Sequence, residues 1–205
     1  GASGFIGKLL YAKFKSLNYE VLRVSRQRKN NYYHSSDYLS LPDGDVLIHL
    51  GESSNRIWVN KQGQSLHEHN KNVIKHINEK KYPKVIYGSS SAIYGDKSAE
   101  LRNEKEIISN YDNYTRIKLY SEKNLNHSNN VILRLANVYG YGMSKENVIS
   151  DILVQLEKRG SIKLKKLKPV RDFINIDDVV NAFVCSLSNE NRGIFNVGSG
   201  KSISI

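Results

Sequence analysis

Two kinds of hydrophobic pattern alternate along the chain. Short, nearly continuous apolar runs, typical of strands buried on both faces of a parallel sheet, occur at 19–24, 45–50, 84–87 and 131–135. Between them, apolar residues recur with helical spacing, as at Ile6, Leu9, Leu10, Phe14 and Leu17. This spacing favours helices at 6–17, 66–80, 114–126 and 177–188. The alternation predicts an α/β fold, a Rossmann-like doubly wound parallel sheet with right-handed crossovers.

A glycine-rich segment opens the chain. Residues 1–7 read GASGFIG and run directly into the first predicted helix. Gly1 permits a tight turn, Gly4 lets the backbone approach a pyrophosphate at the positive helix N-terminus, and Gly7 lets the helix pack closely on the sheet. A Rossmann sheet needs a strand immediately before such a turn. We therefore expect the chain to be trimmed at its N-terminus, with the first strand missing.

The residues about 20 positions further on indicate which nicotinamide cofactor is bound. An acidic residue there would hydrogen-bond the ribose 2′-hydroxyl of NAD, but the chain has Ser25 and Arg26. A hydroxyl and a guanidinium group suit the 2′-phosphate of NADP. The alternative is an exposed basic loop in a basic protein. We place NADP slightly ahead of NAD.

A serine-rich segment and a tyrosine–lysine pair supply candidate chemistry. Ser90 and Ser91 follow the apolar run 84–87, and Tyr114 precedes Lys118 by four positions. On a helix this spacing places both side chains on one face. A nearby ammonium stabilises the phenolate, so such a tyrosine can exchange a proton with a sugar or alcohol hydroxyl. Each feature alone could arise by chance, but their order behind the glycine turn is more specific.

These motifs resemble those of the extended short-chain dehydrogenases/reductases, in the NAD-dependent epimerase/dehydratase group that acts on nucleotide sugars. GASGFIG matches the family's GxxGxxG, DVLIHLGE resembles its DVVIHLAA strand, and SSSAIYG matches its SSxxVYG. YTRIK supplies the YxxxK pair. Later segments, LRLANVYG, RDFINIDDVV and GIFNVGSG, also match, so the resemblance covers essentially all 205 residues.

The resemblance implies roles for individual residues. The catalytic group is Ser90, Tyr114, Lys118 and Asn72, the last taken from an Asn-Val pair. The cofactor is contacted by Gly1, Gly4, Phe5, Ile6, Gly7, Ser25, Arg26, Asp37, Tyr38, Leu50, Gly51, Tyr114 and Lys118. Gly51 replaces an alanine of the family. The substrate is contacted by Ser91, Asn137 and Arg171, although an ion pair with Asp172 is an alternative role for Arg171.

The resemblance also implies the activity: NAD(P)-dependent epimerisation or 4-keto reduction of a nucleotide sugar, with Tyr114 as acid and base. Dehydration is disfavoured, because family dehydratases carry an Asp-Glu pair where this chain has Ser91 and Ala92. The alternative is a catalytically silent regulatory protein that binds the cofactor. Residues 1–135 are expected to form the cofactor domain. Residues 136–205 are expected to contribute substrate-binding segments and late Rossmann elements, with a truncated C-terminus.

Composition narrows the possible partners. The 31 Lys and Arg residues exceed the 20 Asp and Glu residues, giving a net charge of +11, but the lysines are spread along the chain and cluster densely only at 163–171. No nucleic-acid-binding motif accompanies them, so we expect no nucleic-acid partner. No apolar run is long enough to cross a membrane. We expect a cytoplasmic enzyme whose partner is a nucleotide sugar and whose assembly is a homodimer.

A few smaller expectations concern single residues. One cysteine, Cys185, excludes a disulfide framework, and we expect it in the core. The imidazoles of His67 and His69 diverge on a helix, so we expect no metal site there. Asp177 and Asp178 are the candidate N-caps of the last predicted helix.

Overall fold

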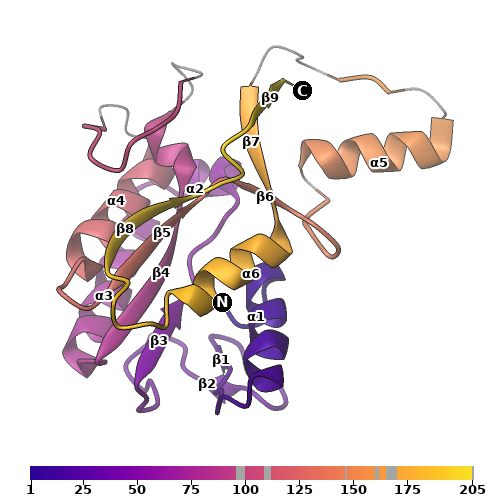
Figure 1. Ribbon diagram of the computed structural model, residues 1–205. Coiled ribbons are helices and arrows are strands. Elements are labelled where there is room, and N and C mark those ends of the chain that lie inside the picture. Colours follow the sequence, from indigo (N-terminus) through magenta and orange to yellow (C-terminus); the bar gives the residue numbers. More distant parts are fainter. Residues whose placement is uncertain (96–99, 109–111, 146, 160–161, 165–169, 205) are drawn as a thin grey trace.

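A parallel four-stranded sheet forms the centre of the protein (Figure 1). In spatial order its strands are β3 (Val46–His49), β4 (Lys84–Ser90), β5 (Val131–Leu135) and β8 (Gly193–Val197). The computed structural model describes residues 1–95, 100–108, 112–145, 147–159, 162–164 and 170–204. The first three strands coincide with the apolar runs at 45–50, 84–87 and 131–135, which confirms those predictions.

Helices cover both faces of this sheet. On one face lie α1 (Phe5–Ser16) and α6 (Ile176–Cys185), and on the other lie α3 (Gln64–Lys80) and α4 (Asn113–Leu125) (Figure 1). Alternate strand residues serve the two layers, because Ile86 and Leu133 pack with the first pair of helices while Val85 and Ile132 pack with the second. The doubly wound α/β prediction is therefore confirmed.

Two smaller sheets flank the central one. The parallel pair β1 (Val24–Ser25) and β2 (Tyr33–His34) joins only two residues of each strand. The predicted strand at 19–24 is therefore wrong except at its end. A strand needs a hydrogen-bonded neighbour, and in the described part of the chain β2 pairs with β1 only at residues 24 and 25. The strand expected before Gly1 would lie outside the 205 residues and stays a prediction.

The second small sheet comes from the C-terminal third of the chain. It contains β6 (Asn137–Tyr139), β7 (Val170–Asn175) and β9 (Ser202–Ser204), with β7 and β9 antiparallel. Helix α5 (Val148–Arg159) projects away from the central sheet (Figure 1). Two short helices, α2 (Arg56–Gln62) and η1 (Ser91–Tyr94), follow β3 and β4. The predicted boundary near residue 135, between the cofactor domain and the later region, stays a prediction. Strand β8 lies after that boundary but belongs to the central sheet.

Helix α6 corrects two expectations. Cys185 is exposed rather than in the core. The buried residues Ile176, Val179, Val180 and Phe183 define one face, and position 185 falls on the opposite face at 100° per residue. The N-cap is Asn175, whose side chain accepts a hydrogen bond of 2.8 Å from the Asp177 backbone N–H. Asp177 instead lies in the first turn, where its negative charge interacts favourably with the helix dipole.

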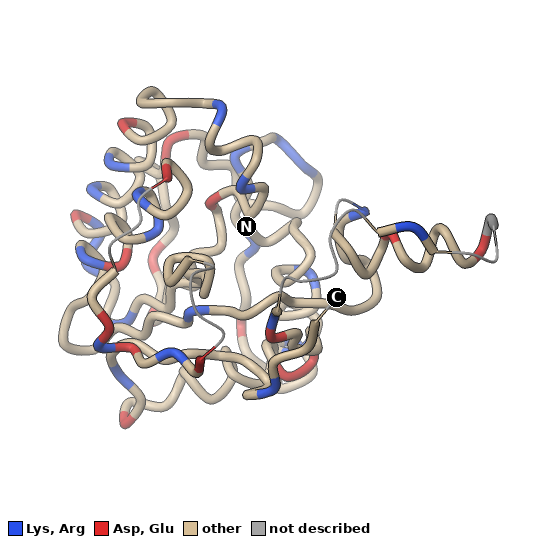
Figure 2. The backbone as a smooth tube through the Cα atoms, turned by 90° about the horizontal axis from the view of Figure 1, so that it is seen from above, with Lys and Arg blue, Asp and Glu red and all other residues tan. Residues whose placement is uncertain are grey.

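The basic residues do not gather on one face. Figure 2 shows Lys and Arg interspersed with Asp and Glu around the described backbone. Of the dense basic stretch at 163–171, residues 165–169 lie outside the described residues. No described helix is long and apolar enough to cross a membrane. No group of three potential metal ligands from His, Cys, Asp and Glu comes together within the described ranges.

Candidate active site

The glycine-rich turn lies on the carboxyl end of β3 and leads into α1. The Gly4 N–H donates to the Gly1 carbonyl at 3.0 Å. A Cβ on Gly1 would come within 2.1 Å of the Leu50 oxygen, and one on Gly7 within 2.3 Å of the Gly1 oxygen. Both positions therefore require glycine. Helix α1 has no side-chain N-cap and no acidic residue in its first turn, which fits an anionic group such as the cofactor pyrophosphate.

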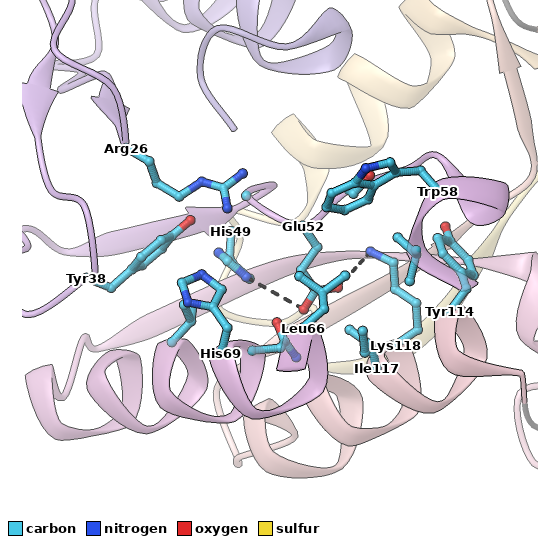
Figure 3. Close-up of a pocket in the computed structure, with 15 residues that line it drawn as sticks. Arg26, Tyr38, His49, Glu52, Trp58, Leu66, His69, Tyr114, Ile117 and Lys118 are labelled. Atoms are coloured by element: carbon cyan, nitrogen blue, oxygen red, sulfur yellow. Dashed lines mark ion pairs between the residues drawn. The ribbon is translucent and has the colours of Figure 1, made fainter. Parts of the chain in front are cut away.

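A cavity of about 300 Å³ opens between the carboxyl ends of β1 and β3 and the helices α2, α3 and α4 (Figure 3). Five of the residues predicted from the sequence line it: Arg26, Tyr38, Gly51, Tyr114 and Lys118. These residues come from four separate segments of the chain. Ligands of open parallel sheets bind at this edge, beyond the carboxyl ends of the strands.

Helix α4 positions the tyrosine and the lysine. Its N-cap is Asp112, whose side chain accepts a 2.8 Å hydrogen bond from the Thr115 N–H. The Tyr114 N–H donates to Asn60 of α2 at 2.9 Å. Tyr114 and Lys118 lie on one face, both buried, with the Lys118 Nζ 5.8 Å from the centre of the Tyr114 ring. The predicted juxtaposition of phenol and ammonium is therefore present.

Glu52, directly after β3, is the partner of Lys118 (Figure 3). Its Oε2 lies 2.9 Å from the Lys118 Nζ and accepts a 2.5 Å hydrogen bond from the Tyr87 hydroxyl. Its Oε1 accepts from Ser121 at 2.6 Å. Burial alone would raise the pKa of the Glu52 carboxyl, but the Lys118 ammonium and the Ser121 hydroxyl hold that pKa below its usual value. Glu52 is therefore ionised.

Burial and Glu52 act in opposite directions on Lys118 and in the same direction on Tyr87. Burial would lower the pKa of Lys118, but the adjacent Glu52 carboxylate raises it above the usual value, so the amine stays charged. Burial and Glu52 both raise the pKa of Tyr87 well above its ordinary range. Tyr87 is therefore a neutral hydrogen-bond donor to Glu52.

His49 ends β3 beneath the cavity. Its ring stacks on Tyr87 with the centres 5.7 Å apart and meets Tyr38 edge to face. Burial lowers the pKa of His49, so the imidazole is neutral near neutral pH. Its Nε2 lies 3.8 Å from Glu52 Oε1, too far for a hydrogen bond, and has no hydrogen-bond partner among the described residues.

Five other predicted residues, Leu50, Ser25, Asp37, Ser90 and Ser91, are not among the described residues that line the cavity. Leu50 meets the glycine turn, and Ser25 is buried with its Oγ accepting from the Gln27 N–H at 3.1 Å. The Asp37 carboxylate accepts from the Leu39 N–H at 3.1 Å. Ser90 ends β4, and its Oγ accepts from the Ala92 N–H at 3.2 Å. Ser91 begins η1, which packs against α4.

Two predicted substrate residues lie in the second small sheet. Asn137 donates from Nδ2 to the Asp172 carbonyl at 3.0 Å, between β6 and β7. Arg171 lies on β7 and donates to the Val170 carbonyl at 2.9 Å. The Asp172 carboxylate accepts from the Ser199 and Gly200 N–H groups at 2.9 and 3.0 Å, which ties the late GIFNVGSG segment to β7. Neither Asn137 nor Arg171 is among the described residues that line the cavity.

The structure does not bring Asn72 to the other predicted catalytic residues. Asn72 is exposed and lines a separate groove between α3 and α4. Asn70 is instead buried, lines the cavity, and donates to Ser121 at 2.9 Å. Helical periodicity could have found it, because Asn70 shares its face with Val73, Ile74 and Ile77.

Sequence reasoning also missed Glu52 and His49 as parts of the site. A carboxylate directly after a buried strand, where the resembling motif has alanine, was the available signal for Glu52. His49 lies within an apolar run that is typical of a buried strand, so the pattern did not mark it as a site residue. Trp58, on the short helix α2 that the sequence patterns did not predict, lines the cavity as well.

Short-chain dehydrogenases/reductases combine a glycine turn, a parallel sheet and a Tyr–Lys pair on one helix, and this chain has that combination. The sequence model of the family described as NAD dependent epimerase/dehydratase matches residues 1–198. The protein therefore belongs to the NAD-dependent epimerase/dehydratase family. It is an enzyme of the extended short-chain dehydrogenase/reductase type, as its motifs indicate.

Curated relatives share this family. The chain is 26% identical over 226 residues to a CDP-abequose synthase of Salmonella typhimurium strain LT2, covering 100% of this chain and 75% of the relative. It is 33% identical over 148 residues to a dTDP-4-dehydro-6-deoxyglucose reductase of Escherichia coli, covering 64% of this chain and 45% of the relative.

Solved structures support the same fold. MoeE5 in complex with UDP-glucose and NAD superposes with a TM-score of 0.83 at 22% identity, covering 100% of this chain and 76% of that chain. A UDP-N-acetylglucosamine 4-epimerase from Bacillus cereus superposes with a TM-score of 0.82 at 22% identity, covering 100% and 75%. At this identity the likeness establishes the fold.

Proposed function

We propose that this protein is an NAD(P)-dependent nucleotide-sugar epimerase or 4-ketoreductase in which Tyr114 is the acid and base. The observation that carries this proposal is the placement of Tyr114 and Lys118 on one face of α4, at the cavity beside the glycine turn. The relatives named above act on nucleotide sugars by their names, which supports the same substrate class here.

Tyr114, Lys118 and Ser90 each have a separate role in the proposed reaction. When bound, the nicotinamide cofactor supplies or accepts the hydride. Tyr114 gives a proton to the sugar oxygen as a carbonyl is reduced, and its phenolate takes that proton as a hydroxyl is oxidised. The Lys118 ammonium stabilises the phenolate and offers an N–H to the cofactor. Ser90, at the end of β4, would hydrogen-bond the same sugar oxygen.

We assign the cofactor phosphates to Gly1, Gly4, Phe5, Ile6 and Gly7, because the uncapped N-terminus of α1 has the geometry of an anion site. Arg26 lies at the other end of the cavity, which supports the preference for NADP over NAD. Asp37, Tyr38, Leu50 and Gly51 would contact the adenosine half and the middle of the cofactor. The proposed substrate contacts are Ser91, Asn137 and Arg171. A homodimer stays a prediction.

The acid–base role is tested by Tyr114→Phe, which removes the hydroxyl and keeps the ring. Turnover should fall by about 100-fold or more, while the dissociation constant for the cofactor changes by less than about threefold. Steady-state kinetics with a nucleotide sugar and fluorescence titration with the cofactor measure the two quantities.

Tyr120→Phe is the matched control. Tyr120 lies on the same helix but faces the separate groove, so its variant should keep normal turnover. Near-normal turnover in Tyr114→Phe would remove Tyr114 from the mechanism. The same measurement decides the alternative of a silent regulatory protein, because such a protein shows no turnover in its native form.

A further inference from the structure

A buried polar cluster joins four elements beneath the proposed active site. Its centre is the Glu52 carboxylate after β3, and its members are Tyr87 of β4, Asn70 of α3, and Lys118 and Ser121 of α4. The Glu52 and Lys118 side chains are each only 7% exposed. The Ser121 hydroxyl donates to Glu52 and accepts from Asn70, so the carboxylate is connected to both α3 and α4, two of the helices that line the cavity.

Glu52 is a departure from the motif that the strand otherwise resembles. DVLIHLGE carries glutamate where DVVIHLAA ends in alanine. An alanine offers no acceptor to an ammonium. The carboxylate is therefore a departure of this chain from that motif, and it is placed against the lysine of the YxxxK pair.

We propose that Glu52 is a positioning residue of this active site, whose carboxylate fixes the orientation of Lys118 and keeps its amine charged at the cofactor. This proposal rests on the role of Lys118 proposed above. The stability of the fold is a weak explanation for the pair, because burying two opposite charges rarely gains more than it costs in desolvation.

The hydrogen-bonding capacity of Lys118 supports a positioning role. An ammonium has three N–H donors. Within the described residues, Nζ has two hydrogen-bonding partners, Glu52 at 2.9 Å and the Gly88 carbonyl at 3.1 Å. One donor therefore remains for a ligand, with its direction set by the other two. The face of the Tyr87 ring, 5.1 Å from Nζ, packs against the amine on another side.

The charge of Lys118 depends on the same contact. Burial lowers the pKa of Lys118, and Glu52 is the strongest of the influences that raise this pKa. The other titratable groups that face the pair are His49 of β3, Tyr87 of β4, and Tyr114 and Glu122 of α4. His49 and Tyr87 are neutral near neutral pH, so the charge balance at Lys118 depends chiefly on Glu52.

The test is the charge state of Lys118 in the intact enzyme. With 13C-labelled lysine, the Cε resonance of Lys118, assigned with Lys118→Met, should show no titration between about pH 6 and about pH 9 in the native protein. In Glu52→Gln the same resonance should titrate within that range. The ratio of variant to native turnover should fall by about tenfold across it, because the charged form is lost.

Glu122→Gln is the matched control. Glu122 is also a buried carboxylate on α4, but its ion pair is with Arg134 at 2.7 Å. It also raises the pKa of Lys118, but less than Glu52 does. Its turnover ratio should change by less than about threefold over the same pH range. Equal pH dependence in the two variants, or a Lys118 resonance that stays charged in Glu52→Gln, would overturn the proposal.

Glu52→Asp keeps the charge of the carboxylate but changes its position, so it separates the two effects. It also keeps the proposal testable if the glutamine variant fails to fold. It should keep Lys118 charged while lowering turnover by a similar factor at every pH. Titration of Lys118 below about pH 9 in the native enzyme would refute the proposal without any variant. An active Tyr114→Phe would instead remove the acid–base assignment alone, since the resonance of Lys118 does not report on Tyr114 chemistry.

Discussion

Gly51 and Tyr38 fit against each other at the carboxyl end of β3. A Cβ on Gly51 would lie 1.8 Å from the Tyr38 hydroxyl oxygen and 3.1 Å from its Cζ. Tyr38 itself is buried and has a positive φ of 67°. The glycine that replaces the family's alanine is therefore explained by the bulk of a neighbouring tyrosine rather than by backbone conformation.

This fit predicts the effect of Gly51→Ala. The added methyl group must displace Tyr38, which should lower the free energy of unfolding by about 1–3 kcal/mol. Adding Tyr38→Phe removes the nearest clashing atom and should recover most of that loss. Urea denaturation of the two single variants and the double variant measures the coupling. Additive losses would show that the loss in Gly51→Ala does not come from a clash with the Tyr38 hydroxyl.

Arg26 predicts the choice of cofactor. If its guanidinium pairs with a 2′-phosphate, NADPH should bind about tenfold more tightly than NADH, and Arg26→Ala should abolish the difference. Arg28→Ala makes the same charge change in the same exposed loop outside the cavity lining and should keep the preference. Fluorescence titrations of the three proteins with each cofactor, at one fixed salt concentration, give the six affinities. Tighter binding of NADH to the native protein would contradict the assignment.

Single residues were predictable where a motif fixes both spacing and geometry. The glycine turn and the Tyr114–Lys118 pair follow from local backbone rules, and the structure places them as expected. Cys185 was misjudged although the helical period held the answer. Glu52 could not be placed from the sequence, because its partners Tyr87, Lys118 and Ser121 meet it only through tertiary packing.

At the scale of elements, α2 and the start of α4 support each other. Asp112 caps α4 and also accepts hydrogen bonds from Arg56 and Asn60 of α2, at 2.7 and 2.9 Å. Periodicity predicted α1, α3, α4 and α6 within a few residues, but it did not predict α5. It did not predict α2, because a helix of 7 residues has too few turns to show a period.

Asp112→Ala should therefore destabilise the segment that carries Tyr114. Loss of the cap alone costs about 1 kcal/mol, and the links to α2 are lost as well. Burial would raise the pKa of Asp112, but its hydrogen bonds from Thr115, Asn60 and Arg56 lower it to about 2 from an ordinary value of 3.8. Its contribution is thus complete above about pH 4 and disappears as the pH falls towards 2.

Urea denaturation between about pH 2 and 7 tests this, since the difference between native protein and variant should shrink only at the acidic end. Glu68→Ala is the control, because its 2.8 Å pair with Lys71 lies on an exposed helix face. Its effect should be within about 0.5 kcal/mol of zero. A pH-independent loss in Asp112→Ala would show that the carboxylate charge contributes nothing.

At the scale of the whole molecule, the central sheet and the sheet of β6, β7 and β9 are connected at the carboxyl ends of β5 and β8. The Ala136 N–H donates to the Val197 carbonyl at 2.9 Å, so the chain passes from the central sheet to β6 next to β8. The proposed substrate residues Asn137 and Arg171 lie in the second sheet, while the proposed catalytic residues lie on β4 and α4. The apolar runs predicted the central strands β3, β4 and β5 but not β8, and the short strands β6 and β9 have too little pattern to be recognised.

The type of sugar chemistry depends on the whole site. Elimination of water from a 4-keto sugar needs an acid and a base beyond the tyrosine. The resembling dehydratases carry carboxylates directly after the position of Ser90, where this chain has Ser91 and Ala92 at the start of η1. Among the described residues that line the cavity, the one carboxylate is Glu52, and it is held by Lys118.

Enzyme supplied with a UDP- or dTDP-hexose and either cofactor should therefore give no 4-keto-6-deoxy product. A dTDP-4-keto-6-deoxy sugar with NADPH, or a plain nucleotide hexose with NAD, should instead be reduced or epimerised without loss of water. Mass spectrometry of the nucleotide sugar distinguishes the outcomes, because dehydration lowers the mass by one water, epimerisation leaves it unchanged and reduction adds two hydrogens. A product lighter by one water would mean that another acid and base serve the sugar, and it would exclude the epimerase and reductase assignments together.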